Sequence, residues 1–166
     1  MTFSTGWPIN RSSPTAGSRA GSKSAALAVA RRMELLARVP LFTGLTKRQL
    51  QALAKTCDTH HWPAGALIVA EGSHDQYCYV VVEGTVEVIR GGNQVALLGP
   101  GEFFGEVALF DPGPRSASVT TATDVVAVGL GRQGFVDVVL NDPQVALRTL
   151  GAMARRVRET TEKLAY

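Results

Sequence analysis

The chain has 166 residues, of which 45% are hydrophobic, and it carries a formal net charge of +3. This length suffices for one domain with a sizeable core, and the composition is that of an ordinary globular protein. The first 32 residues hold five of the 17 Lys and Arg residues and none of the 14 Asp and Glu residues, so the remainder has a net charge of −2. A mildly acidic folded part argues against nucleic acid as a partner.

The sequence gives no sign of a membrane segment or a disulfide framework. No apolar run reaches the roughly 18 residues of a membrane span, and the run at 25–30 is too short for a signal peptide. Cys57 and Cys78 are too few and too sparse for a disulfide framework or a zinc site. We therefore expect two buried thiols in a cytoplasmic protein that has no membrane partner.

Helices are predicted near the start of the chain. Residues 1–23 are mostly Ser, Thr, Gly, Pro and Arg, which predicts a flexible basic tail ahead of a single domain over 24–166. Ser24 can cap a first helix, which ends before Pro40. Thr46 and Gln49 have the spacing of a capping box at the start of a second helix.

The middle of the chain, residues 63–130, alternates glycines with short runs rich in β-forming residues. Several runs show the period of two that is typical of half-buried strands, and their spacing predicts a β-sandwich or barrel. The six predicted strands are 66–71, 77–82, 85–90, 94–99, 116–121 and 124–130.

Helical periodicity returns over residues 131–166. Phe135 and Val138 fit a short helix, after which Asp142 caps a longer helix that has Pro143 in its first turn. Positions spaced by three and four form an apolar stripe with one polar member along this helix. The stripe consists of Leu147, Leu150, Ala154, Val157, Thr161 and Leu164.

The segment GEFFGEVALFDPGPRSASV at 101–119, called the cassette below, has the features of a phosphate site. Gly105 allows a ligand to approach the backbone closely, and residues 106–109 predict one helical turn whose N–H groups suit an anion. The rigid turn at 111–114 brings the chain back, and Arg115 offers a planar fork that matches phosphate. Glu106 would repel phosphate, so it needs a hydroxyl donor, such as a ribose, or a cation.

The cassette closely resembles the pattern FGE-x-A-L…R-[STA]-A-x-V of cyclic-nucleotide-binding domains, which occur in bacterial cAMP receptors and protein kinase A regulatory subunits. The resemblance covers about residues 40–166. It implies a mainly β fold, in which a jelly-roll-like β-roll is flanked by N-terminal helices and C-terminal lid helices. It also implies that Glu106 binds the ribose 2′-OH and that Arg115 binds the cyclic phosphate. Backbone contacts from Gly105, Val107 and Ala108 would complete this part of the site.

The resemblance extends to the remaining site residues and to the ligand. Ser116 would reach the phosphate or the purine, and Thr160 and Thr161 would meet the adenine amino group. Arg156 lies four residues before Thr160, hence on the same helix face, and could steady Glu106. The implied ligand is cAMP, with cGMP bound more weakly and no metal. Val88 is expected in an apolar wall of the pocket.

These features predict a regulatory cAMP sensor whose last helix closes on the ligand. Its output would pass to an unknown protein effector, or to a weak homodimer formed through the same helix. Two alternatives remain open: an interaction module of this fold that needs no ligand, and the sensor part of a larger transcription factor, channel or transporter. No helix-turn-helix fits before residue 166.

An enzyme is not expected. A cupin-type metal site could use histidines, and His60, His61 and His74 are available. Adjacent histidines on an extended chain point in different directions, however, and no HxH-plus-Glu cluster follows.

Overall fold

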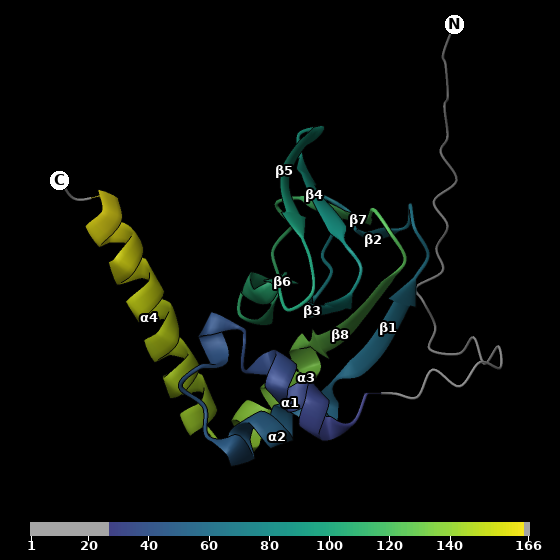
Figure 1. Cartoon of the computed structure of the whole chain (residues 1–166). Coiled ribbons are helices and arrows are strands. Elements are labelled where there is room, and N and C mark those ends of the chain that lie inside the picture. The colour runs from purple at the N-terminus through teal and green to yellow at the C-terminus, as the bar shows by residue number, and fades with distance from the viewer. Residues whose placement is uncertain (1–26, 165–166) are drawn as a thin grey trace, which may run out of the picture.

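Two facing β-sheets with helices at one end form the body of the protein, which is seen here in a computed structural model that describes residues 27–164 (Figure 1). The predicted tail over 1–23 and the predicted cap Ser24 lie outside the described residues. Both sheets are antiparallel and have four strands. The predicted β-roll with flanking helices is confirmed.

The N-terminal helices follow the predicted order. Helix α1 (Val29–Leu36) starts at the N-cap residue Ala28, which makes no side-chain capping bond, and a short 3-10 helix, η1 (Pro40–Phe42), follows it. The capping box predicted for α2 (Lys47–Thr56) is confirmed. The Thr46 hydroxyl accepts the Gln49 N–H at 3.2 Å, and the Gln49 side chain accepts the Thr46 N–H at 2.9 Å.

The strands are divided between two sheets that face each other. The first sheet has the order β1 (Asp58–Trp62), β8 (Val125–Gly131), β3 (Tyr77–Glu83) and β6 (Phe103–Phe104). The second has the order β2 (Leu67–Val69), β7 (Ser118–Thr121), β4 (Val86–Arg90) and β5 (Asn93–Leu98).

The β-roll begins earlier than predicted. Strand β1 starts at Asp58, whereas the sequence pattern placed the first strand after residue 63. Its sequence, DTHHW, lacks the apolar alternation that marks the other strands, and its pairing with β8 along the sheet edge holds it in place. Strand β6 has only two residues, too few for any periodicity.

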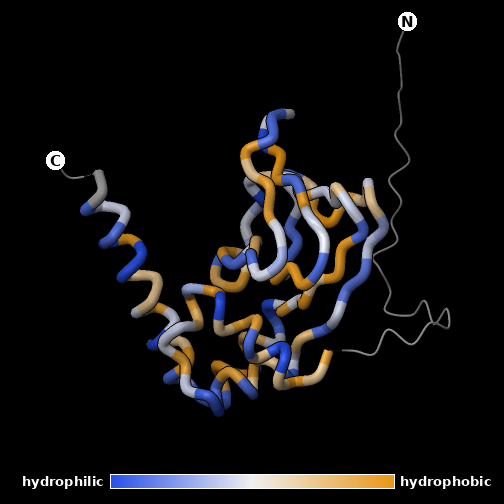
Figure 2. The backbone as a smooth tube through the Cα atoms, in the orientation of Figure 1, coloured by the Kyte–Doolittle hydropathy of each residue, from blue (hydrophilic) through white to orange (hydrophobic). Residues whose placement is uncertain are grey.

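Strand β3 separates two hydrophobic cores. Cys78 and Val80 face the helices, whereas Tyr79 and Val81 face the interior of the roll, as the period of two requires. Figure 2 shows that hydrophobic residues alternate with polar ones along the strands of the roll. Both cysteines are buried free thiols, as predicted, and burial raises the pKa of Cys57 to about 12.

The C-terminal helices are α3 (Arg132–Asn141) and α4 (Gln144–Leu164). Asp142 accepts the N–H of Gln144 at 3.1 Å, which confirms the predicted cap. Helix α4 packs against η1 and rises beside the roll (Figure 1). Within the described residues, no helix combines the length and apolarity needed to cross a membrane.

The predicted apolar stripe of α4 does not face the core. Val145, Thr149 and Ala152 are buried instead, whereas Leu147 and Val157 are 61% and 65% exposed. The face of α4 that carries these three buried residues is therefore the one that faces the rest of the domain, and α4 is in contact with η1. The stripe is exposed both in the early turns, at Leu147 and Leu150, and later, at Val157.

Candidate functional site

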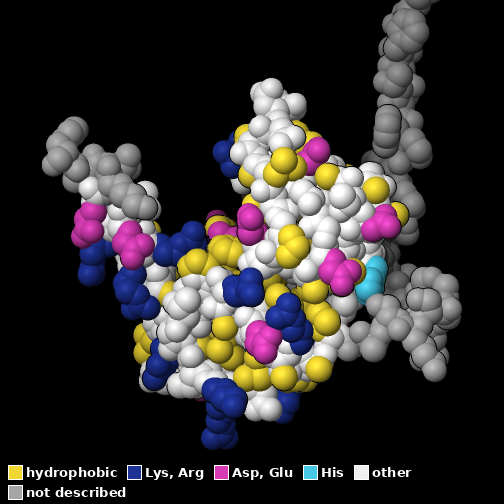
Figure 3. All heavy atoms as spheres, in the orientation of Figure 1, with side chains coloured by type: hydrophobic (Ala, Val, Ile, Leu, Met, Phe, Trp, Pro, Cys, Tyr) yellow, Lys and Arg dark blue, Asp and Glu magenta, His cyan; other side chains and the backbone are white. Residues whose placement is uncertain are grey.

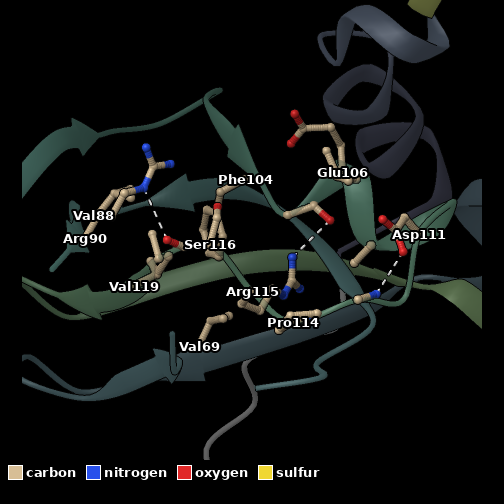
Figure 4. A pocket seen from close by; sticks show the side chains of 15 residues that line it. Val69, Val88, Arg90, Phe104, Glu106, Asp111, Pro114, Arg115, Ser116 and Val119 are labelled. Atoms are coloured by element: carbon tan, nitrogen blue, oxygen red, sulfur yellow. Dashed lines mark hydrogen bonds between the residues drawn. The ribbon is translucent and has the colours of Figure 1, made fainter. Parts of the chain in front are cut away.

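A cavity of about 270 Å³ lies between the cassette and the second sheet (Figure 4). Its apolar wall consists of Val69, Val88 and Val119, which the sheet register brings together from three neighbouring strands. Phe104 adds an aromatic ring. The cassette contributes the polar lining, so the cavity has one apolar side and one polar side.

The cassette begins with a tight turn at Gly105. This residue has φ +84°, a backbone conformation that glycine adopts without the usual steric cost. A Cβ added there would lie 2.6 Å from the Tyr77 carbonyl oxygen, so the close approach of two chain segments also requires glycine. The predicted helical turn follows as the 3-10 helix η2 (Glu106–Leu109).

The Arg115 side chain lies at the edge of the cavity and is only 10% exposed. Nη2 donates to Asp75 Oδ1 at 2.7 Å and to the Tyr77 carbonyl oxygen, and Nη1 donates to the Gly105 carbonyl oxygen at 3.2 Å. Its backbone N–H also donates to the Ser73 carbonyl oxygen at 2.7 Å. Local contacts therefore hold this guanidinium group in a defined position.

Asp75 is a site residue that the sequence reasoning missed. Its Oδ1 atom accepts the Tyr77 N–H at 2.8 Å as well as the Arg115 bond, and its side chain is 24% exposed. An Asp two residues before a strand is a signal for this local turn. It gives no indication of a partner 40 residues later in the chain.

Glu106 lies on the other side of the polar lining and is half-buried. Figure 4 shows its carboxylate turned away from Arg115, so the two groups are not paired with each other. Arg156 was expected to steady Glu106, but no ion pair joins them among the described residues. Arg156 is exposed on α4, and its contact with Glu106 in a ligand-bound site stays a prediction.

A second hollow, of about 310 Å³, separates the cassette from the later turns of α4. Val107 and Glu106 line one side of it, and Arg156, Thr160 and Thr161 line the other. The two hydroxyls donate to carbonyl oxygens of α4 itself, both at 2.9 Å. Figure 3 shows charged side chains of both signs along this helix.

The structure thus divides the predicted site residues between two places. The cavity beside the second sheet is lined by Gly105, Glu106, Val107, Ala108, Arg115, Ser116 and Val88. The three α4 residues, Arg156, Thr160 and Thr161, line the second hollow and do not line the cavity.

Arg90 also lines the cavity, and the sequence reasoning did not identify it. It is the last residue of β4, and its Nε donates to the Ser116 carbonyl oxygen at 3.2 Å (Figure 4). The alternation that begins at Val86 and Val88 places Arg90 on the same face of the strand. The spacing of two residues from Val86 to Val88 to Arg90 could have identified Arg90 as a lining residue from the sequence.

The histidines are not arranged as a metal site. His60 lies among aromatic rings, stacked on Trp62 with a centroid distance of 5.4 Å, and His74 Nδ1 lies 3.2 Å from the Pro112 carbonyl oxygen. In the part of the chain that the structure describes, no three His, Cys, Asp or Glu side chains are grouped to hold a metal ion.

A β-roll with a cationic group at the edge of a small cavity defines a class of ligand-binding domain, and comparisons with known proteins identify the family. Residues 59–142, about half of the chain, match the model of the cyclic nucleotide-binding domain. The chain therefore belongs to this family, as the cassette predicted.

Individual relatives agree with this assignment. The "CRP-like cAMP-activated global transcriptional regulator" of Mycobacterium tuberculosis is 34% identical over 137 residues, which are 80% of this chain and 61% of that protein. The "cAMP-dependent protein kinase regulatory subunit" of Aspergillus niger is 37% identical over 102 residues, 60% of this chain and 25% of that protein. This chain therefore spans less than two thirds of either relative.

One solved structure covers the same region. The N-terminal domain of a transcriptional regulator from Streptomyces coelicolor A3(2) is 35% identical and superposes with a TM-score of 0.73. The match covers 80% of this chain and 96% of that domain. The described fold is thus that of a cyclic nucleotide-binding regulatory domain similar to those of CRP-like regulators.

Proposed function

We propose that this chain is a cAMP-responsive regulatory module that performs no catalysis of its own. One observation carries the proposal: a nearly buried guanidinium group, Arg115, is held by three acceptors at the edge of a cavity with an apolar wall. The cavity volume is near the lower end of the roughly 300–1,000 Å³ typical of small-molecule sites, which suits a mononucleotide. The names of the relatives, "cAMP-activated" and "cAMP-dependent", favour cAMP over other ligands.

Each group of the nucleotide has a chemically suitable partner in the cavity. Arg115 binds the cyclic phosphate, because a monoanion in a poorly hydrated site needs a charged donor. Glu106 accepts the ribose 2′-OH, and Gly105 with Val107 and Ala108 supplies backbone contacts. The base lies against Val88 and its neighbours in the apolar wall, which provide flat contact area, and Ser116 lies at the rim.

Ligand binding moves the end of α4 towards the roll. The hollow between α4 and η2 leaves room for this closure. The hydroxyl oxygens of Thr160 and Thr161 can then accept hydrogen bonds from the adenine amino group. A ligand shifts such an equilibrium only through its greater affinity for the closed state. The exposed stripe at Leu147 and Val157 is the surface that changes neighbours.

The output is a change in what α4 contacts. The partner is an unidentified protein effector or a second copy of this chain, which would pair weakly through the exposed stripe. Because the chain spans 61% of the mycobacterial regulator, the same motion could act on further domains of a longer protein. A ligand-independent interaction module of the same fold is the competing function.

Calorimetry on the purified chain tests the proposal. We expect saturable binding of cAMP, and binding of cGMP that is weaker by about 1–2 kcal/mol, the scale of one or two neutral hydrogen bonds. Linear 5′-AMP is the matched control, because it keeps the base and ribose but lacks the cyclic monoanion. Absence of binding by both cyclic nucleotides would favour the interaction module.

A further inference from the structure

Arg90 is a second cationic side chain on the wall of the cavity, and the roles proposed above leave it unused. It extends from the end of β4 to the rim, where Nε donates to the Ser116 carbonyl oxygen at 3.2 Å. Within the described residues, its two terminal nitrogens have no hydrogen-bond partner. Figure 4 shows the guanidinium group beside Val88 and apart from Arg115.

The position of Arg90 follows from the strand that carries it. Val86 and Val88 point to the interior of the roll, and the alternation continues to Arg90. Val88 pairs with Val119, which in turn pairs with Val69, so Arg90 lies at the rim of the apolar wall. A nucleotide with its phosphate at Arg115 and its ribose at Glu106 has only its base left to place against that wall.

A guanidinium group with only its Nε bonded can distinguish between purine bases. Its Nε is engaged by a backbone oxygen, which leaves terminal N–H donors facing outward and no acceptor. The guanine edge offers two acceptors, O6 and N7, and a guanidinium fork matches such a pair. Adenine offers N7 beside an amino group, so the second contact would set one donor against another.

We propose that Arg90 determines base specificity and favours 6-oxopurines at this cavity. The inference rests on the proposed function, because it assumes that the cavity holds a cyclic nucleotide. It adds that the roll and α4 have opposite preferences: Arg90 favours guanine, whereas the Thr160 and Thr161 hydroxyls favour adenine. The preference for cAMP is modest for this reason, and it depends on closure of α4.

The test compares three ligands on the full chain: cAMP, cGMP and cIMP. Cyclic IMP has O6 and N7 but lacks the guanine 2-amino group, so it isolates the edge that Arg90 would contact. Titrations use the wild-type chain, Arg90→Ala and Arg90→Lys. The lysine variant retains the charge but loses the planar fork. Lys55→Ala, an exposed site on α2, controls for the loss of one positive charge.

We expect Arg90→Ala to weaken cGMP and cIMP binding about tenfold, near the lower end of discrimination by a bidentate contact, since the side chain is exposed. Affinity for cAMP should stay within about twofold, a change well below 1 kcal/mol. Arg90→Lys should lose most of the same discrimination, and Lys55→Ala should change none of the three affinities.

Two results would overturn the role of Arg90. Equal weakening of all three ligands by Arg90→Ala would show that the residue acts on the phosphate through charge. Unchanged affinities would show that the side chain only anchors the Ser116 loop. If the wild-type chain bound none of the three nucleotides, the proposed function itself would fail, which the wild-type titration alone reveals.

Discussion

The cassette and the end of α4 both carry residues that the family resemblance predicted to contact one ligand. The two regions differ, however, in how far these residues are buried and hydrogen-bonded. Arg115 is 10% exposed and has three acceptors on neighbouring segments of the roll. Arg156 is exposed, and Thr160 bonds only to its own helix. In the proposed binding mode, the phosphate end of the site is therefore already formed, whereas contacts between α4 and the base would require the helix to move. The proposed function thus assigns binding to a preformed half and the response to a movable half.

The largest expected effect is at the preformed half. Arg115→Ala should weaken cAMP binding by roughly 3–5 kcal/mol, because the phosphate monoanion would lose its charged partner in a poorly hydrated site. Calorimetry measures the loss, and thermal unfolding checks that the variant still folds. Arg156→Ala is the matched control in the movable half, where an exposed charge should contribute less than about 1 kcal/mol. Equal losses of cAMP affinity in the two variants would contradict the distinction between a preformed half and a movable half.

A smaller effect is expected when glycines of the two regions are replaced by alanine. Gly105→Ala should lower the free energy of unfolding by roughly 1–3 kcal/mol, because it strains a left-handed residue and brings Cβ to 2.6 Å from the Tyr77 carbonyl oxygen. Chemical denaturation measures it. Gly72→Ala has a similar φ, +81°, with nothing within 4 Å of the added Cβ, so it isolates the strain.

The corresponding change in α4 should have the opposite sign. At Gly151 an added Cβ meets only the flexible Arg155 side chain at 3.6 Å, so Gly151→Ala should stabilise the helix by about 0.5–1 kcal/mol. If Gly105→Ala cost no more than Gly72→Ala, the close packing of the cassette against β3 would be contradicted.

The smallest expected effect is a pH dependence of stability that originates in the roll, at His60 of β1. Burial lowers the pKa of His60 below its ordinary value of 6.5, against the nearby charges of Asp58 and Asp75. At pH values near and below 6.5, His60 is protonated to a greater extent in the unfolded chain than in the folded one. The free energy of unfolding should therefore fall as the pH drops from 7 to 5. Denaturation at several pH values measures the slope.

His60→Gln should reduce this slope, because it removes the group whose proton uptake differs between the two states. His74→Gln is the control, because it removes an imidazole that is exposed rather than packed among aromatic rings. A wild-type slope that His60→Gln does not alter would assign the pH dependence to other groups.

Local sequence signals predicted the parts of the fold that local contacts determine. The Thr46–Gln49 capping box and the turn at Glu106–Leu109 each depend on residues within a few positions. The cavity lining at Val88 followed from strand alternation and the family pattern. For the capping box and the turn, the interaction that decides the structure is present in the segment itself; for Val88, the segment gives the face and the pairing with Val119 gives the neighbour.

Contacts between distant segments could not be predicted in the same way. Strand β1 has no apolar alternation, and its pairing with β8 decides its conformation. The bond between Asp75 and Arg115 joins residues 40 positions apart. The stripe from Leu147 gave the period of α4 correctly, but the packing of Val145 and Thr149 decides which face is buried. The periodicity of apolar residues shows which side chains share a helix face, but it does not show what that face packs against.

Amide hydrogen exchange with and without cAMP tests most directly whether a preformed half binds and a movable half responds. Without ligand, residues 155–164 should exchange quickly, because the end of a helix opens locally where little packs against it. With cAMP, these amides should become markedly protected, whereas the cassette, already ordered, should gain less. Equal protection of residues 155–164 in both states would contradict the closure of α4 and make it a static support.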